Sequence, residues 1–181
     1  ERNTHLDYIG VVPSRWLAPR LFAAHFAITS IDEKEHKKQF RYWHRGGFFE
    51  NNLSYASQSS FHVEVGGWAA YEKPDGGLHL HATSEGQTLS LELTSQKDLC
   101  YHGKRGFSQR GADPQVASYY CAFTRLHAKG KLVIDGHGHT VEGSSWMDHE
   151  KMLASQEVLI HGWNWLSLQL KTKEELMLYL F

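Results

Sequence analysis

The sequence predicts an all-β protein whose antiparallel strands close into a barrel. Apolar and polar residues alternate with a period of two in several segments, whereas the helical period of about 3.6 residues is hard to find. Glycine-containing turns separate these segments at short intervals, which is typical of sandwiches and barrels. A closed antiparallel sheet also removes exposed strand edges. The chain of 181 residues is long enough for one domain with a single core.

The clearest alternation lies in residues 61–65, 78–82 and 88–93, where apolar side chains share one face of each predicted strand. These strands are expected to be half-buried. Turn-forming sequences predict breaks at residues 74–77, 84–86, 128–130 and 135–138.

Two hairpins are predicted in the second half of the chain. Residues 131–134 pair with 140–142, and residues 163–170 pair with 175–181. Two polar stretches, 51–60 and 103–114, are predicted to be loops at the mouth of the barrel.

We expect the chain to have two parts. Residues 1–24 form an irregular N-terminal segment that covers the barrel from outside, and residues 25–181 form the barrel domain. The apolar residues 175–181 end without a turn or a polar tail, which suggests that a longer protein continues beyond them.

Composition excludes some classes of partner. Lys and Arg number 19 and Asp and Glu number 20, giving a formal net charge of −1, so we expect no nucleic-acid partner. The apolar stretches are shorter than the roughly 20 residues of a membrane helix, so we expect no stable membrane insertion. Cys100 and Cys121 form no zinc motif, and are expected to be reduced rather than paired.

The densest chemistry lies in residues 143–150. On a strand, Trp146, Asp148 and Glu150 share one face, whereas Met147 and His149 share the other. Carboxylates about 7 Å apart repel each other, which raises the pKa of a carboxyl group and suits it to general acid catalysis. The alternative is that both carboxylates face solvent and Trp146 is a surface or core residue.

The same segment carries a resemblance to a known family. Residues 146–150, followed by 162–165, 168–170 and 175–179, resemble the signature of carotenoid 1,2-hydratase (hydroxyneurosporene synthase) and AttH-like lipocalin-type proteins. Residues 25–29, 105–111, 117–120 and 124–126 resemble it in the same order upstream.

The resemblance implies a lipocalin-like barrel that is the first of two in a longer chain. It implies that the partner is the missing second barrel. Without that barrel, apolar surface exposed at the cut edge predicts a homodimer. It also implies a bacterial periplasmic, secreted or peripheral membrane location.

For activity, the resemblance implies cofactor-independent, acid-catalysed hydration of an isoprenoid- or polyene-like ligand. Asp148 would protonate an alkene and Glu150 would order the water that captures the cation. The aromatic faces of Trp146, Trp163 and Trp165 would stabilise that cation.

This sequence departs from the family pattern at two positions. Lys151 stands where the motif usually has Trp, and Asn164 where the family commonly has Asp. Many AttH-like members have no demonstrated activity, so a non-catalytic lipid-binding or cell-envelope protein is the alternative function.

Other side chains are candidates for the ligand pocket. Tyr119 and Tyr120 alternate, so one of them faces the interior, while His25 and His161 either bond within the pocket or are structural. His79 and His81 share a strand face, which fits either a solvated surface or two ligands of a zinc site; we expect the surface and no metal. Three arginines are expected to pair with the protein's own carboxylates, with an anionic ligand as the alternative: Arg105, Arg110 and Arg125.

Overall fold

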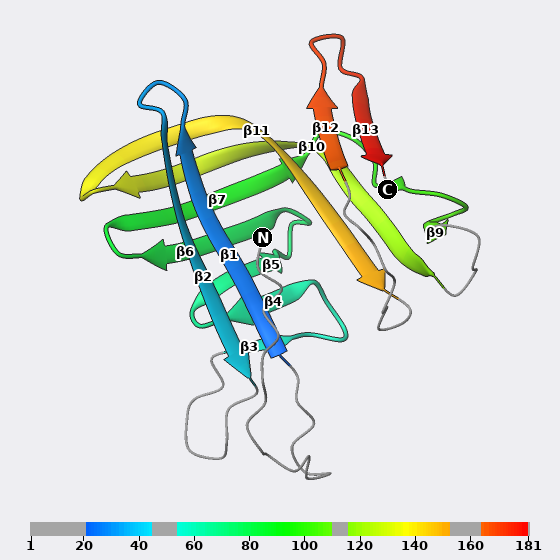
Figure 1. The fold of residues 1–181 in the computed structure, drawn as a ribbon, viewed down its shortest axis with the longest axis horizontal. Helices are drawn as coiled ribbons and strands as arrows, with labels where there is room; N and C mark the ends of the chain where they lie inside the picture. Colours follow the sequence, from blue (N-terminus) through cyan, green and yellow to red (C-terminus); the bar gives the residue numbers. More distant parts are fainter. Residues whose placement is uncertain (1–20, 45–53, 110–115, 153–163, 181) are drawn as a thin grey trace.

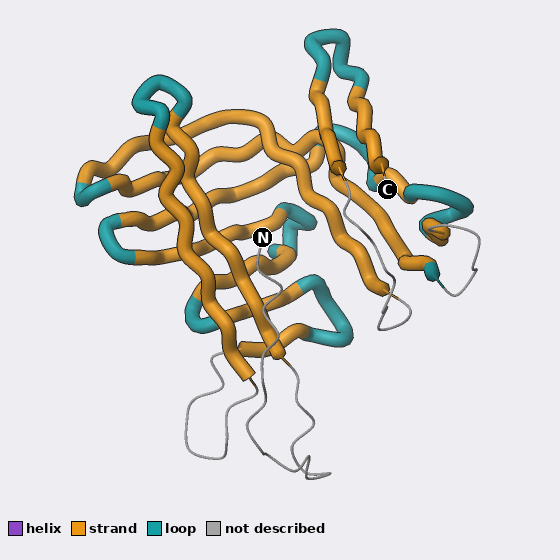
Figure 2. The backbone as a smooth tube through the Cα atoms, viewed as in Figure 1, coloured by secondary structure: helices purple, strands orange, loops and turns teal. Residues whose placement is uncertain are grey.

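The computed structural model describes residues 21–44, 54–109, 116–152 and 164–180, and every regular element in these ranges is a β-strand. All strand pairs run antiparallel, which confirms the predicted all-β class (Figures 1 and 2). None of the described residues forms a helix able to cross a membrane. The strands are β1 (Leu21–Ser30), β2 (Glu35–His44), β3 (Ser54–Ala56), β4 (His62–Val65), β5 (Trp68–Glu72), β6 (Leu78–Ser84), β7 (Gln87–Ser95), β8 (Cys100–Tyr101), β9 (Phe107–Gln109), β10 (Ala117–Ile134), β11 (His137–Met152), β12 (Asn164–Gln169) and β13 (Glu175–Leu180).

The strands form one large sheet and two hairpins. The nine-stranded sheet has the order β11-β10-β7-β6-β5-β4-β3, and β8 and β9 also pair with β10. The hairpin β1–β2 crosses this sheet, and the hairpin β12–β13 stands beside the upper part of β10 and β11 (Figure 1). Strand pairing within the described ranges leaves the sheet open, an arrangement compatible with the lipocalin-like class.

Several boundaries differ from the prediction. Strand β1 begins at Leu21, so residues 21–24 belong to a strand, and residues 1–20 lie outside the described ranges. The stretches 51–60 and 103–114 contain the short strands β3 and β9, because a neighbouring strand supplies their pairing despite their polar sequences.

In the longest hairpin, β10–β11, one part of β10 pairs with β7 and the other part pairs with β8 and β9. Its turn is Asp135–Gly136, whose φ angles of 49° and 82° suit the two-residue turns that join antiparallel strands. The predicted turn at residues 128–130 is wrong, because these residues continue β10. A Cβ on Gly130 would collide with the Ser90 carbonyl of β7, so this glycine permits close strand approach and does not mark a turn.

A β-bulge divides this hairpin. The register shifts between Phe123 and Leu126, where three steps on β10 match two on β11. Phe123 and Leu126 would point to opposite faces of a regular strand, yet both reach one apolar cluster. We call the face bearing this cluster the inner face, and the opposite one the outer face.

The inner face carries the core. One cluster joins β6, β7 and β10, and the other joins β1 to β5 and β6. The first contains Leu78, Leu93, Leu126 and Ala128 with Phe61, Leu91, Phe123 and Met147; the second contains Phe26, Trp68 and Ala82 with Ala24, Ile28 and Leu89.

The β12–β13 hairpin, predicted correctly, packs on the outer face at the bulge. The Gln169 side-chain amide donates to the carbonyls of Thr124 (2.7 Å) and Ser145 (3.0 Å), which flank the register shift. Arg125 Nε donates to Glu175 at 2.5 Å, which confirms that this arginine pairs with a carboxylate of the protein. The other face of the hairpin exposes a row of leucines: Leu166, Leu168, Leu170, Leu176, Leu178 and Leu180.

A matched pair of leucine variants tests this assignment of the core. Leu126 is 1% exposed and Leu178 is 45% exposed. We expect Leu126→Ala to lower the free energy of unfolding by about 3 kcal/mol, because it leaves a cavity beside Phe123 and Met147. Leu178→Ala should lower it by less than about 1 kcal/mol. Urea unfolding followed by tryptophan fluorescence measures both, and equal losses would contradict the assignment.

Candidate functional site

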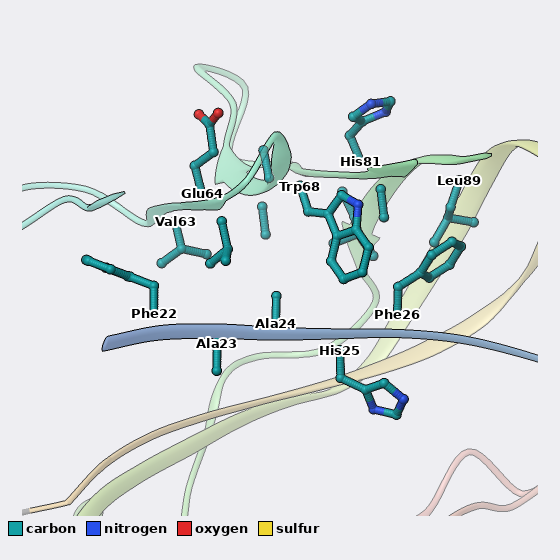
Figure 3. A pocket seen from close by; sticks show the side chains of 15 residues that line it. Phe22, Ala23, Ala24, His25, Phe26, Val63, Glu64, Trp68, His81 and Leu89 are labelled. Carbon is teal, nitrogen blue, oxygen red and sulfur yellow. The ribbon is translucent and has the colours of Figure 1, made fainter. Parts of the chain in front are cut away.

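An apolar cavity of about 380 Å³ lies between β1 and the inner face of the nine-stranded sheet. Ala24 and Phe26 point from β1 toward the sheet, and Trp68 points back toward β1 (Figure 3). Small side chains at Ala24, Ala70 and Ala82 leave the space that larger ones would fill. Its apolar lining is Phe22, Ala23, Ala24, Phe26, Val63, Val65, Trp68, Ala69, Ala70, Leu80, Ala82 and Leu89.

Polar contacts hold the β1–β2 hairpin over this cavity. The Arg41 guanidinium lies 4.3 Å from the Trp68 ring centroid, and donates to the carbonyls of Thr83 (2.7 Å) and Gly66. Trp68 Nε1 donates to the same Thr83 carbonyl at 2.6 Å. Since Trp68 also meets Phe26 edge-to-face at 5.8 Å, its indole is fixed as one wall of the cavity.

His25 lies at the rim of the cavity, but its ring points away from it (Figure 3). The ring stacks on Phe40 of β2 at 4.4 Å, on the solvent side of the hairpin. His81 and Glu64 also border the cavity with their polar ends directed outward (Figure 3). The interior therefore presents hydrocarbon and aromatic surface.

A second group of side chains surrounds Asp148 on the outer face. Trp146 Nε1 donates to Asp148 Oδ1 at 2.9 Å, and Ser118 Oγ donates to Glu150 Oε1 at 2.5 Å. Trp146, Asp148 and Glu150 thus share a face, as the alternation predicts. The strand register sets Asp148 opposite Ala122 and Glu150 opposite Tyr120.

Tyr120 forms the buried base of this group and is only 6% exposed. Its hydroxyl lies 3.4 Å from Met177 Sδ and interacts with the side chains of Asp148 and Trp165. Burial, reinforced by the hydrogen bond and negative charge of Asp148, raises the pKa of Tyr120 well above its ordinary value of 10.0. The phenol therefore stays protonated at any physiological pH.

The His102 ring packs against that of Tyr120 in a tilted arrangement, with centroids 4.3 Å apart and planes at 45°. Burial lowers the pKa of His102 below 6.5, although the charges of Asp148 and Glu150 oppose that shift. Asp148 and Glu150 are themselves exposed, so the described residues do not shield the two carboxylates from water.

The predicted site residues fall into different places. Trp146, Asp148, Glu150, Tyr120 and Trp165 come together on the outer face.

The remaining predicted residues do not join this group. Tyr119 alternates to the inner face and is 54% exposed, and Lys151 lies opposite it, away from the carboxylates. His161 and Trp163 lie outside the described residues, as does Arg110.

Several residues of the Asp148 group and of the β1 cavity were not predicted from the sequence. His102, Ser118 and Met177 join the Asp148 group from strands or loops distant in sequence, so no local spacing marks them. The cavity had one sequence signal, the alternation of small and large apolar residues at Ala24 and Phe26.

The other candidate ligands have partners of their own. His79 Nδ1 lies 2.7 Å from Glu92 Oε1, and His81 Nε2 lies 3.3 Å from Thr83 Oγ1. Within the described ranges, no three His, Cys, Asp or Glu residues are grouped to hold a metal. Cys100 and Cys121 are free thiols.

Comparisons with known proteins agree on one family. A family model described as AttH-like matches residues 6–181. The fold matches a crystal structure of a Nitrosomonas europaea protein assigned to AttH, with a TM-score of 0.79 and 27% identity. The match covers 88% of this chain and 48% of that one, so this chain spans about half its length. No curated protein matches the chain.

The burial of Tyr120 predicts a pH-dependent stability. Its folded-state pKa lies above the unfolded value of 10.0, so its contribution is complete below pH 10 and is lost as the pH rises above it. We expect the free energy of unfolding of the wild type to fall more steeply above pH 10 than that of Tyr120→Phe. Denaturant unfolding at several alkaline pH values measures the slopes, with Tyr119→Phe as the exposed control. Parallel slopes for wild type and Tyr120→Phe would contradict the assignment.

Proposed function

The chain belongs to the AttH-like family, and from this premise we propose that it binds an apolar, isoprenoid- or polyene-like small molecule in the cavity between β1 and the nine-stranded sheet. The cavity itself is the observation that carries the proposal. Its volume of about 380 Å³ falls in the common range for small-molecule sites, roughly 300–1,000 Å³.

The lining favours a flat, unsaturated ligand. Phe22, Phe26 and Trp68 offer aromatic faces, and the rim groups of Glu64 and His81 point away from the interior (Figure 3). Among the residues labelled in Figure 3, no polar side chain that could form a hydrogen bond with a hydrophilic ligand points into the cavity. A cavity of this size takes one end of a long polyene, or a single isoprenoid ring with a short tail.

Filling the cavity tests this proposal. Ala82 is buried against Phe26 and Trp68, so Ala82→Leu occupies space that the ligand would use. We expect β-ionone to quench the tryptophan fluorescence of the wild type, and Ala82→Leu to weaken binding about tenfold or more. Ala27→Leu adds the same bulk on the exposed side of β1 and should bind like the wild type. Equal binding by a folded Ala82→Leu variant would exclude this cavity as the site.

Acid-catalysed hydration is the second candidate function. It is favoured by the grouping of Asp148 with three aromatic side chains, Trp146, Tyr120 and Trp165. In such a reaction the carboxyl proton passes to an alkene carbon, the aromatic faces stabilise the resulting tertiary cation, and water adds to it. The water then loses a proton to the carboxylate, which restores the acid.

The exposure of Asp148 and Glu150 weighs against this candidate. An acid that acts near neutral pH needs a carboxyl group shielded from water, and the apolar cavity lies on the other face of the sheet. Non-catalytic binding, the function of a lipid-binding or cell-envelope protein, is therefore the better supported of the two.

Product mass separates the two candidates. The acid assignment predicts that polyenes incubated with the wild type gain the mass of one water, and that Asp148→Asn abolishes the gain. Asp98→Asn removes an exposed carboxylate elsewhere and should leave the yield unchanged. No gain with a wild-type protein that binds the polyene would leave binding as the function, and an equal gain with Asp148→Asn would exclude this residue as the acid.

A further inference from the structure

A smaller hollow of about 270 Å³ lies beyond the bulge, where β8, β10 and β11 run together. We call it the basic hollow. The side chains that matter here are Tyr101, Arg105, Tyr119, Cys121, His149 and Lys151.

The strand register explains how these residues meet. Cys121 of β10 pairs with Tyr101 on one side and with His149 on the other. Tyr119 pairs with Lys151 and, on its other side, with Phe107. Directly opposed side chains of antiparallel strands share a face, so two neighbouring rows line one side of the sheet.

Arg105 reaches the hollow from a tight loop between β8 and β9. Its φ of 55° is unusual for a residue with a side chain, and two flanking glycines make the loop possible. A Cβ on Gly103 would collide with the Phe107 carbonyl, and one on Gly106 would lie 3.3 Å from the Tyr101 ring. Two hydrogen bonds with Tyr120, at 3.0 and 2.8 Å, tie the loop to β10, so the arginine stands on a fixed support.

The hollow is positively charged. Arg105 and Lys151 both line it, and no aspartate or glutamate of the described ranges does. The nearest carboxylates along β11, Asp148 and Glu150, bond with Trp146 and Ser118 on the opposite face. Within the described part of the chain, neither cation makes an ion pair, so the predicted carboxylate partner of Arg105 is not found among these residues.

The hollow also presents aromatic surface. Tyr101 is 62% exposed and Tyr119 is 54% exposed, so both rings are accessible to a flat molecule. The Tyr119 ring makes an edge-to-face contact with the Phe107 ring, with centroids 6.0 Å apart. Exposed tyrosine rings beside two cations suit a ligand with a planar apolar body and an anionic end.

We propose that the basic hollow binds a small aromatic carboxylate, whose acid group lies between Arg105 and Lys151 and whose ring packs on Tyr101 and Tyr119. A volume just below the usual range for drug-sized ligands fits a single ring with a short acidic side chain. This site is separate from the β1 cavity, and it stands whether or not that cavity binds an apolar ligand.

The test compares cinnamate with its neutral analogue cinnamyl alcohol, using amide NMR shifts on the full chain. Cinnamate should shift the amides of Tyr101, Tyr119 and Lys151 and bind more weakly as salt rises. Arg105→Gln and Lys151→Gln should each weaken cinnamate about tenfold, with little effect on the alcohol. Lys131→Gln, an exposed lysine elsewhere on β10, is the matched control.

Three results would overturn the proposal. These are equal affinity for cinnamate and the alcohol, undiminished cinnamate binding by a folded variant that carries both Arg105→Gln and Lys151→Gln, and cinnamate shifts confined to residues of the β1 cavity. Ala82→Leu should leave cinnamate binding unchanged, so failure at the basic hollow is distinguishable from failure at the β1 cavity.

Discussion

The arrangement of the Asp148 group and of the basic hollow depends on one β-bulge, between Phe123 and Leu126 on β10. On one side of the bulge, Leu126 faces the apolar cluster of the inner face. On the other side of the bulge, Phe123 of β10 and Met147 of β11 face this cluster, and Tyr120 points to the outer face. The carbonyls beside the shift do not stay unpaired, because the Gln169 amide bonds those of Thr124 and Ser145. The bulge therefore fixes both the face that Asp148 occupies and the position where the β12–β13 hairpin docks.

Sequence patterns predicted the strands better than their orientation in space. The alternation in residues 61–65, 78–82 and 88–93 correctly predicts strands β4, β6 and β7, and the residues it places inside include the buried Leu78, Ala82 and Leu93, although Val63 is exposed. The alternation in residues 146–150 correctly groups Trp146 with Asp148, but the face they occupy depends on a bulge in the partner strand. Residues 123–126 contain no glycine to mark that bulge, and Gly130, which is present, marks a close approach of strands instead.

The apolar cavity and the carboxylates of residues 146–150 lie on opposite faces of the sheet, although the motif alone predicts that they share one pocket. The cavity beneath β1 contains aromatic and aliphatic groups, whereas the carboxylates, His102 and the Tyr120 hydroxyl gather on the other face. The cavity could not be predicted from catalytic residue types, because its essential side chains are alanines, whose role is to leave space. An apolar ligand beneath β1 would be separated from Asp148 by the thickness of the sheet.

The surroundings of Asp148 depend in turn on Glu175. A two-stranded hairpin is only marginally stable alone, so β12–β13 takes its position from its contacts with β10 and β11. The Glu175 carboxylate is 7% exposed and lies 2.5 Å from both Lys97 and Arg125. Burial alone would raise the pKa of Glu175, but these two cations outweigh it and lower the pKa below 4.5, so this anchor is present at neutral pH and lost only in acid. Since Met177 and Trp165 reach Tyr120 from the same hairpin, the ion pairs of Glu175 also keep the Asp148 group assembled.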